Sequence, residues 1–529
     1  MASETIHDVV ILGGGLAGLT LALQLRGRFA DLDIVVLERG AHPVPAAAHK
    51  VGESTVEIGA RYLAETLGLR EHLDTAHIRK FGFRFFYSDG RSDLDQVTEL
   101  GVTRVFPTPT WQIDRGILEN FLGEEARRRG IGFRDCAVVR SFELDGQAGH
   151  RVHADIAGGE EILSARWLID ASGRAGLIKR RLGLHQPNGH DANAVWFRID
   201  DRLAIDDWCA NAEWRARCSP PERWRSTNHL VGPGYWVWLI PLGSGAHSVG
   251  IVADATVHPL DTMNTFERAL AWLDRHQPAV AREVAARRDK LLDFRFLRGY
   301  SHDSRQMFSG DRWALTGDAG VFLDPFYSPG TDFIAIANTY ICALIEHDRA
   351  GQPVGPFARL YEQVFKSFYE NTLSLFRGQY PLFGDADVMS IKVIWDYTYY
   401  WGVLCQLVMQ DRLTDFALFA EVQAELLRAQ DLNRRMQAFL RRWAAVNVAG
   451  NPAVMLDQIE LPWFAEVNSR LSDRLDREAL IARLRRHVAL MGDLAATIAA
   501  RAAQACPGLD ADGLAADGSA PLALFDLAA

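Results

Sequence analysis

The fold of this chain is decided by residues 8–18, which read Asp8-Val9-Val10-Ile11-Leu12-Gly13-Gly14-Gly15-Leu16-Ala17-Gly18. A short apolar run enters a glycine cluster of the form GxGxxG, and a helical stretch continues through Leu25. In this pattern the first glycine permits a tight turn, the second lets a pyrophosphate approach the backbone, and the third lets helix and strand pack closely. The segment predicts a strand, a turn and a helix, with Gly13, Gly15, Ala17 and Gly18 against a dinucleotide.

A second apolar strand follows at residues 34–37 and ends at Glu38. Strand, helix and strand together form the βαβ unit of a parallel sheet. Glu38 lies 20 residues beyond Gly18, where a carboxylate accepts hydrogen bonds from ribose hydroxyls, and Arg39 follows it. The alternative is an exposed glutamate at a strand end, but motif, context and acid together favour dinucleotide binding.

Three distant segments indicate which dinucleotide is bound. They are Gln112-Ile113-Asp114-Arg115, Asp170-Ala171-Ser172-Gly173 and Leu315-Thr316-Gly317-Asp318-Ala319. In this order they resemble the FAD fingerprints of para-hydroxybenzoate-hydroxylase-like flavoproteins. The resemblance implies FAD as the cofactor, with Arg115, Gly317 and Asp318 contacting it.

Residues 328–331, Ser328-Pro329-Gly330-Thr331, precede a long helical stretch that runs to about Glu346. Serine suits the N-cap and proline the first helical position. The N–H groups and positive dipole of such a helix start favour flavin or an anion. Gly330 and Thr331 are therefore further candidate cofactor contacts.

The segment Gly234-Tyr235-Trp236-Val237-Trp238-Leu239-Ile240-Pro241 contains WxWxIP. In a strand, Trp236, Trp238 and Ile240 point to one side while Val237 and Leu239 point to the other. Ordinary core packing is the alternative for two tryptophans. Beside the FAD pattern, the motif closely resembles that of the flavin-dependent halogenases, which implies that Trp236, Trp238, Ile240 and Pro241 line a tunnel.

The family resemblance also implies an essential lysine at the end of that tunnel. Lys80-Phe81-Gly82-Phe83 resembles the family segment that carries it, so Lys80 is the candidate catalytic residue. We expect a strand here in which Phe81, Phe83 and Phe85 face away from Lys80. Its nitrogen would hydrogen-bond to hypohalous acid or form a haloamine; a solvated surface lysine is the alternative.

The loop Asp324-Pro325-Phe326-Tyr327-Ser328-Pro329-Gly330 separates the branches of the resembled family. Tyr327 stands where tryptophan halogenases have a glutamate, so the chain looks closer to the phenolic branch, whose rings are activated by their own oxygen. The family halide rests on two consecutive backbone N–H groups, and Pro329 has none. Gly330 and Thr331 are the candidate replacements for this halide site.

The fold class expected is α/β: a GxGxxG Rossmann-like FAD-binding domain with an inserted, mostly antiparallel substrate sheet and a C-terminal helical domain. Residues 1–350 would form the FAD-binding module, with the inserted sheet at about 80–110 and 190–305. Residues 351–529 would form the helical domain covering the substrate pocket, with the last 20 or so residues loosely docked. Residues 376–401 are dense in aromatic side chains, which suits a flat substrate or core packing equally.

Composition narrows the classes of function. A net charge of −10 argues against nucleic acid as a partner, and no run approaches the roughly 18 apolar residues of a membrane span. Six cysteines without a CxxC pair favour a cytoplasmic protein without a disulfide framework. His49, His77 and His229 have no metal-ligand spacing, so no metal is expected.

The predicted function is halogenation, with chloride or bromide, of an electron-rich and phenolic aromatic substrate, free or tethered to a carrier protein. The resemblance implies reduced FAD (FADH2), O2 and halide ion as cofactors, and a separate flavin reductase as partner, because only one full GxGxxG is present. A monomer or homodimer is expected. One alternative is a flavin monooxygenase that hydroxylates a phenol without halide; another is a non-enzymatic flavoprotein of a biosynthetic complex.

Overall fold

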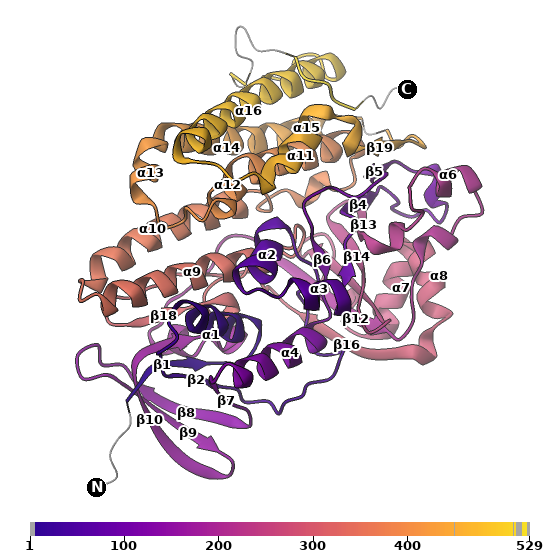
Figure 1. Ribbon diagram of the computed structural model, residues 1–529. Helices are drawn as coiled ribbons and strands as arrows, with labels where there is room; N and C mark the ends of the chain where they lie inside the picture. Colours follow the sequence, from indigo (N-terminus) through magenta and orange to yellow (C-terminus); the bar gives the residue numbers. More distant parts are fainter. Residues whose placement is uncertain (1–5, 449, 512, 515–520, 526–529) are drawn as a thin grey trace. The chain divides into compact units, whose positions relative to one another are not determined.

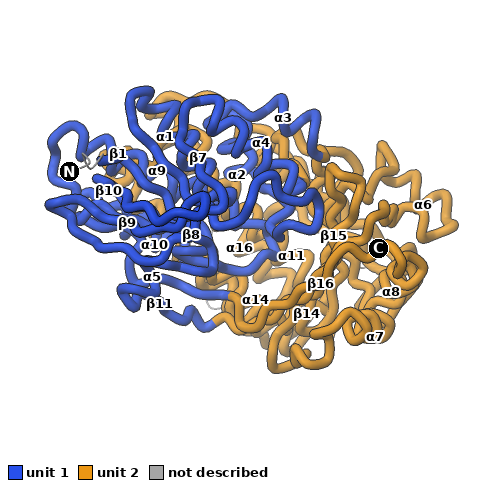
Figure 2. Tube along the Cα trace, turned by 90° about the horizontal axis from the view of Figure 1, so that it is seen from below, with its two compact units in different colours: residues 1–77, 113–189, 301–369 blue, residues 78–112, 190–300, 370–529 orange. Residues whose placement is uncertain are grey.

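The computed structural model describes residues 6–448, 450–511, 513–514 and 521–525, so most of the C-terminal segment expected to be loosely docked lies outside the described residues. The chain divides into two compact units, each assembled from three separate segments (Figure 2). Unit 1 comprises residues 1–77, 113–189 and 301–369, and unit 2 comprises residues 78–112, 190–300 and 370–529.

Unit 1 is built on a seven-stranded sheet in the order β7-β2-β1-β10-β9-β8, with β18 also pairing with β10 (Figure 1). The pairs β1–β2, β1–β10, β2–β7 and β10–β18 are parallel, while β8, β9 and β10 form an antiparallel meander. The strands are β1 (Ile6–Leu12), β2 (Ile34–Leu37), β7 (Gly132–Arg134), β8 (Ala137–Glu143), β9 (His150–Ile156), β10 (Gly159–Asp170) and β18 (Trp313–Leu315). Because β1, β2, β10 and β18 run parallel, their carboxyl ends meet at one edge of the sheet.

Unit 1 also contains long helices. They are α1 (Leu16–Arg28), α4 (Arg115–Arg128), α9 (Gly330–Arg349) and α10 (Val354–Leu373), the last of which continues past Tyr369, where unit 1 ends. The shorter helices are α2 (Glu57–Arg61), which continues in a π-helical turn (Tyr62–Thr66), α3 (Arg70–Ala76) and α5 (Leu177–Arg181). Helix α9 packs against α1 and α2. The two-stranded sheet of β11 (His185–Gln186) and β17 (Asp303–Ser304) completes the unit.

Unit 2 is built on an eight-stranded, mostly antiparallel sheet in the order β16-β12-β15-β14-β13-β4-β5-β19. Its strands are β4 (Phe83–Phe86), β5 (Glu99–Gly101), β12 (Ala192–Ile199), β13 (Thr227–Gly232), β14 (Tyr235–Pro241), β15 (His247–Asp254), β16 (Leu291–Leu297) and β19 (Met455–Asp457). Only β4–β13 and β5–β19 pair in parallel. A separate antiparallel pair joins β3 (Ile78–Arg79) and β6 (Trp111–Gln112).

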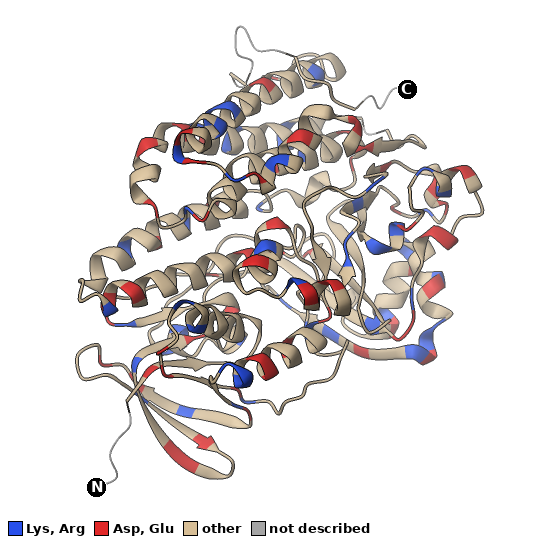
Figure 3. Ribbon diagram, in the orientation of Figure 1, with Lys and Arg blue, Asp and Glu red and all other residues tan. Residues whose placement is uncertain are grey.

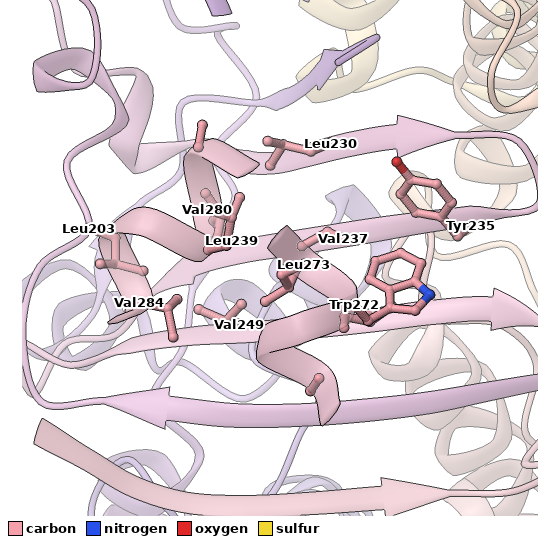
Figure 4. Packing of buried hydrophobic residues seen from close by; sticks show 14 of the residues in the cluster. Leu203, Leu230, Tyr235, Val237, Leu239, Val249, Trp272, Leu273, Val280 and Val284 are labelled. Carbon is pink, nitrogen blue, oxygen red and sulfur yellow. The ribbon is translucent and has the colours of Figure 1, made fainter. Parts of the chain in front are cut away.

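One face of this sheet is covered by α7 (Phe266–His276) and α8 (Pro278–Ala285). Figure 4 shows Val237, Leu239 and Val249 of the sheet packed among Leu273, Val280 and Val284 of the two helices. Val237 and Leu239 alternate with Trp236 and Trp238 along β14 and therefore point to the opposite face, as alternation in a strand requires. The sequence therefore predicted correctly which residues of this strand share a face.

The remaining helices of unit 2 are mainly C-terminal. They are α11 (Ala386–Tyr399), which continues in a π-helical turn (Tyr400–Leu404), α12 (Cys405–Met409), α13 (Phe416–Glu421), α14 (Gln423–Val446), α15 (Pro462–Ser469) and α16 (Arg477–Ala505); α6 (Ala212–Ala216) lies within the inserted segment. A buried network joins α11 to α14: Lys392 Nζ lies 2.6 Å from Asp396 Oδ2 and 2.8 Å from Gln437 Oε1. Burial lowers the pKa of Lys392, which its buried carboxylate partner opposes.

Acidic and basic residues are interspersed along the ribbon (Figure 3). Many of them form surface ion pairs, such as Arg485–Glu425 at 2.8 Å between α16 and α14. None of the described helices is both long and apolar enough to serve as a membrane span. The α/β fold with mixed sheets and C-terminal helices agrees with the fold class that the sequence predicted.

Candidate active site: a nucleotide edge in unit 1 and an aromatic face in unit 2

The glycine loop of unit 1 lies at the carboxyl edge of the parallel strands. Gly13 has φ +112°, and its N–H donates to the Leu37 carbonyl at 2.8 Å. A Cβ at Gly13 would overlap the Ala171 carbonyl, whose carbon would lie 2.7 Å away. A Cβ at Gly18 would overlap the Gly13 carbonyl and lie 3.2 Å from Ile11. Both positions therefore require glycine, for a turn at Gly13 and for close helix–strand packing at Gly18.

Glu38 reaches back to this loop from the end of β2. Its Oε2 accepts a hydrogen bond from the Gly14 N–H at 2.8 Å, and its Oε1 accepts one from the Gly40 N–H at 2.7 Å. The carboxylate is half-buried, and the neighbouring Arg39 is exposed. This arrangement places an acidic side chain beside the glycine loop, where the dinucleotide pattern expects it.

The second FAD-like segment meets the first within unit 1. Gly317 has φ +60°, and a Cβ there would fall 2.8 Å from the Cβ of Ala17, so the turn packs directly on α1. Asn338 of α9 holds the two together: its Nδ2 donates to the Ala17 carbonyl at 3.3 Å, and its Oδ1 accepts from the Thr316 hydroxyl at 2.7 Å. The sequence analysis missed Asn338, which lies in an apolar helix without a local motif.

Asp318 is half-buried beside several cations of unit 1. Burial raises the pKa of its carboxyl group, and the positive charges of Arg115, Arg174, Lys179 and Lys50 oppose that rise. Arg115 opens α4, where its Nη1 donates to the Val51 carbonyl at 2.6 Å and its Nη2 pairs with Glu119. This cationic surrounding is suited to a pyrophosphate.

Glu119 was missed by the sequence analysis, although it lies one helical turn after Arg115. Its buried carboxylate accepts from the Leu16 N–H at the start of α1 (3.3 Å) and from Lys50 Nζ (3.1 Å), and His49 Nε2 lies 2.9 Å from it. Burial alone would raise the pKa of Glu119, but Arg115, His49 and Lys50 hold it below its usual range. Glu119 thus holds the side chains of Arg115 and Lys50 near the start of α1, next to the glycine loop.

These residues fit FAD. The glycines leave a cradle that side chains would fill, the cations supply charge for phosphates, and a Cβ at Gly15 would lie 3.1 Å from Lys50 Nζ. Glu38 and Asp318 supply carboxylates for hydroxyl groups. Among the described residues, no group of three or more His, Cys, Asp or Glu side chains is arranged to hold a metal ion.

Helix α9 does not begin as the sequence predicted. Its first residue is Gly330 and its N-cap is Pro329, whereas Ser328 has φ +53° and was expected at the N-cap. The Ser328 N–H donates to the Pro325 carbonyl at 2.9 Å, which closes a turn before the helix. Gly330 is exposed and a Cβ there would meet nothing within 4 Å, while Thr331 is buried.

Lys80 lies in unit 2 just before β4 and is buried, with 3% of its surface exposed. Its backbone N–H donates to the Thr110 carbonyl at 2.9 Å, and the Thr227 N–H donates to the Gly82 carbonyl at 3.1 Å. Contrary to expectation, the strand does not start at residue 80, and Phe83 does not face away from Lys80: the Nζ lies 3.3 Å from the centroid of the Phe83 ring. Gly82, with φ +76°, bends the chain between them.

Phe83 and Phe85 share a face of the unit 2 sheet with Trp236 and Trp238. Cross-strand pairing sets this face, because Phe85 pairs with His229 and His229 pairs with Trp238. The His229 ring stacks on Phe85 at 4.7 Å and lies 5.3 Å from the ring of Trp236. We refer to these side chains, Phe83, Phe85, His229, Trp236 and Trp238, as the aromatic face; His229 was read from sequence as an unremarkable histidine.

Both tryptophans of the aromatic face are fixed by hydrogen bonds. Trp236 Nε1 donates to the Tyr380 hydroxyl at 3.0 Å, and Trp238 Nε1 donates to Ser248 Oγ at 3.1 Å. The Trp238 ring also lies over Gly250, where a Cβ would overlap it. Ile240 and Pro241 continue β14 and are buried, but Pro241 still pairs with His247 in the ladder.

The aromatic density of residues 376–401 partly joins this face. Tyr397 of α11 lies 5.9 Å from the Phe83 ring and 4.6 Å from Trp401, which in turn packs on Phe464 at 4.8 Å. Trp395 instead donates to Asn433 Oδ1 at 3.0 Å inside the helices. The segment therefore serves both packing within the helices and packing on the aromatic face.

Comparison with known proteins first defines the class. Residues 7–244 match the family model described as "FAD binding domain", so the chain is an FAD-binding flavoprotein. It is 25% identical over 430 residues to the flavin-dependent halogenase chlA of Dictyostelium discoideum, covering 75% of this chain and 70% of that protein. It is 26% identical over 349 residues to a 1H-pyrrole-2-carbonyl-[peptidyl-carrier protein] chlorinase of Pseudomonas fluorescens, covering 62% of this chain and 73% of that protein.

Solved structures agree at the level of the fold. Halogenase PltM in complex with phloroglucinol and FAD superposes with a TM-score of 0.63 at 18% identity, over 96% of this chain and 99% of that one. The flavin-dependent halogenase CmlS superposes with a TM-score of 0.53 at 25% identity, over 70% of this chain and 64% of that one. The chain thus has a segment that matches an FAD-binding domain and is similar, in sequence and in fold, to flavin-dependent halogenases.

Proposed function

We propose that this halogenase chlorinates or brominates a phenolic ring, with Lys80 as its catalytic residue. The observation that carries the proposal is the buried amine of Lys80 lying against the aromatic face of unit 2. An exposed fraction of only 3% is unusual for a lysine that only serves solubility, since lysine side chains are among the least often buried. An amine held among rings suits a reaction between a small electrophile and a flat aromatic molecule.

FAD is held by unit 1 in this proposal, through Gly13, Gly15, Ala17, Gly18, Glu38, Arg39, Arg115, Gly317, Asp318, Gly330 and Thr331. When bound and reduced, FAD would supply the two electrons and two protons with which O2 converts a halide ion and a further proton into hypohalous acid and water. A separate flavin reductase would renew the reduced cofactor. The chain's own residues then bind, orient and shield the reactants.

Lys80 binds and orients the hypohalous acid in unit 2. Its ammonium form donates a hydrogen bond to the oxygen and so makes the halogen more electrophilic; its neutral amine would instead take the halogen as a haloamine. In both cases the ring attacks the halogen, the ring proton is lost, and water is released overall. Trp236, Trp238, Ile240 and Pro241 exclude bulk water along β14, because all four are buried.

A phenolic substrate is supported by the absence of a glutamate at residue 327, which is Tyr327 here. A phenol carries its own activating oxygen, so it needs less help from a second acid. The fold comparison points the same way, since PltM was solved with phloroglucinol. The relative from Pseudomonas fluorescens is named for a carrier-bound pyrrole, so the competing hypothesis is a substrate tethered to a carrier protein.

For the halide, the proposal uses the first N–H groups of α9. Pro329 has none, so Gly330 and Thr331 supply two consecutive donors at the positive end of a 20-residue helix. The open space around Gly330 suits an ion. Gly330→Pro removes one donor, and we expect about a tenfold higher KM for bromide; Gly330→Ala keeps the donor and serves as its control.

Pro329 is also the observation that favours a second candidate, a flavin monooxygenase that hydroxylates a phenol without halide. One experiment separates the two: purified protein is incubated with FAD, a flavin reductase, NADH, O2 and a panel of phenols and carrier-bound pyrroles, with and without chloride or bromide. Halogenated phenol that depends on halide and disappears in Lys80→Ala supports the proposal. Hydroxylated product without halide, and NADH consumption without reductase, would establish the alternative.

A further inference from the structure

Phe83 is placed to control the amine of Lys80. Gly82, in the left-handed region at φ +76°, turns the chain so that the Lys80 side chain returns over the ring of the residue three positions later. The Nζ lies 3.3 Å from the ring centroid, and both side chains are buried. A cation over a ring face is attracted by the negative face of the ring, and more strongly where water is excluded.

The Phe83 ring is itself held in place from two other elements of unit 2. His229 of β13 lies 5.3 Å from it with an interplanar angle of 53°, and Tyr397 of α11 lies 5.9 Å away at 49°. The backbone on both sides of Gly82 is fixed as well, by the bonds from Lys80 to Thr110 and from Thr227 to Gly82. The ring is therefore a rigid support, not a side chain that follows the lysine.

The strand is braced from its other face by a buried ion-pair network. Arg84, between Phe83 and Phe85, pairs with Glu99 of β5, and Glu99 also accepts from Arg223 Nε at 2.8 Å. Arg223 Nη2 donates to the Trp214 carbonyl at 2.7 Å. These contacts fix β4 independently of the aromatic face, so a change at Phe83 should act locally.

We propose that Phe83 is a positioning residue whose ring face holds the Lys80 ammonium in place for the reaction. The inference rests on the proposed function only in assigning the chemistry to Lys80; the cation–π contact itself stands on geometry. In unit 2 the Phe83 ring contacts Lys80, His229 and Tyr397. Arg79 and Arg84 flank this segment in the chain, and the Arg225 carbonyl accepts from the Phe81 N–H at 3.2 Å. The ring favours the ammonium over the neutral amine, so its loss should release the Lys80 proton at lower pH.

The first experiment reads Lys80 directly on the FAD-loaded protein. Trace acetic anhydride is applied across a pH series, and acetylation of Lys80 is measured by mass spectrometry against Lys290, whose side chain is 45% exposed. In Phe83→Leu we expect the pH midpoint of Lys80 labelling to fall by about one unit. Phe83→Tyr keeps the ring face and should keep the wild-type midpoint.

Phe85→Leu is the matched control, because Phe85 is an equally buried phenylalanine of the same strand whose ring stacks on His229 at 4.7 Å. We expect the labelling midpoint of Lys80 to stay at its wild-type value in Phe85→Leu. If Phe83→Leu does not fold, Phe83→Met, which fills the space with a flexible apolar chain, carries the same expectation. An unchanged midpoint in the folded Phe83 variant, or an equal shift in Phe85→Leu, overturns the proposal.

The second readout is the pH profile of halogenation. If the ammonium is the active form, Phe83→Leu loses activity at lower pH than wild type; if the amine is active, the variant gains activity at lower pH. The limb set by Lys80 therefore moves to lower pH in both cases, and Phe83→Tyr should restore it. Halogenated product that persists in Lys80→Ala would contradict the proposed function. If Lys80→Ala is inactive but the limb of the pH profile does not move in Phe83→Leu, only the positioning role of Phe83 is contradicted.

Discussion

We refer to the region around Gly13, Gly18, Glu38, Gly317 and Asp318 of unit 1 as the nucleotide edge. It is shaped mainly by backbone atoms, whereas the aromatic face of unit 2 is shaped by side chains. At the nucleotide edge, the obstacle beside Gly13 is the backbone of Ala171, and Glu38 is held by the N–H groups of Gly14 and Gly40. On the aromatic face, the obstacle beside Gly250 is the ring of Trp238. The Ala171 backbone cannot move aside, whereas the Trp238 ring can tilt. We therefore expect an added Cβ to be more damaging at Gly13 than at Gly250.

The largest effect is expected for Gly13→Ala. Alanine at φ +112° is strained, and its Cβ would overlap the Ala171 carbonyl, which leaves the loop no way to relax. We expect FAD affinity to fall about a thousandfold, or about 4 kcal/mol. The measurement is the visible flavin absorbance of the purified protein relative to its protein absorbance. Gly27→Ala is the control, because a Cβ at Gly27 in α1 would meet nothing within 4 Å; full FAD content in Gly13→Ala would refute the rigid-backbone account.

Gly250→Ala is the corresponding change on the aromatic face. Its Cβ would overlap the Trp238 ring, which should tilt away and lose the hydrogen bond to Ser248. We expect about 2 kcal/mol of destabilisation by urea unfolding, a changed tryptophan fluorescence, and unchanged FAD content. Loss of FAD as severe as in Gly13→Ala would erase the distinction between the two regions.

Glu38→Gln tests the backbone contacts more gently. The carboxylate accepts an N–H on each oxygen, and glutamine retains one acceptor while placing an NH2 group against the other donor. We expect the Kd for FAD to rise about tenfold, measured by titration of flavin fluorescence. Glu65→Gln, which removes an exposed carboxylate paired with Arg70, should leave the Kd at its wild-type value. Equal Kd values in both variants would mean that Glu38 shapes the loop without contributing to binding.

The same difference between backbone and side-chain construction explains how well the sequence predicted each region. The nucleotide edge is encoded by contiguous motifs, because glycine spacing reports backbone conformation directly. Its fold and the positions of Gly13, Glu38 and Asp318 were therefore predictable. Asn338 and Glu119 were not, since each lies on a helix without a local motif and reaches the edge only through the tertiary fold.

The aromatic face was predicted only where strand alternation sufficed. The common side of Trp236 and Trp238 follows from period two, as does the opposite side of Val237 and Leu239, but the helices α7 and α8 that cover this opposite side were not predicted (Figure 4). The orientation of Phe83 was wrong, because a positive φ at Gly82 breaks the alternation that the prediction assumed. From the sequence His229 was considered only as a metal ligand, because its place beside Phe85 follows from the pairing of β13 with β4, which is distant in the chain.

Buried carboxylates extend the comparison beyond the sites. Several are paired with cations: Asp396 with Lys392 and Glu99 with Arg84 and Arg223 in unit 2, and Glu119 with Arg115 and Lys50 in unit 1. Glu362 of α10 in unit 1, which is half-buried, is instead held by backbone, since its Oε2 accepts from the N–H groups of Met307 and Phe308 at 2.8 and 3.0 Å. Burial raises the pKa of Glu362 to about 6, from 4.5 for an ordinary glutamate, although both N–H groups favour the charged form.

The smallest effect is therefore expected for Glu362→Gln, and its sign is set by the raised pKa. A carboxyl whose folded pKa exceeds its unfolded one costs nothing below about pH 4.5, costs progressively more up to about pH 6, and keeps that cost above it. Glutamine retains an oxygen for both N–H groups but never ionises, so at pH 8 the variant should be about 1 kcal/mol more stable than wild type, with the gain vanishing near pH 4. Urea unfolding at the two pH values measures this, with the exposed Glu370→Gln of the same helix as control. An equal gain in stability at both pH values would mean that the gain does not come from removing the buried charge of the Glu362 carboxylate.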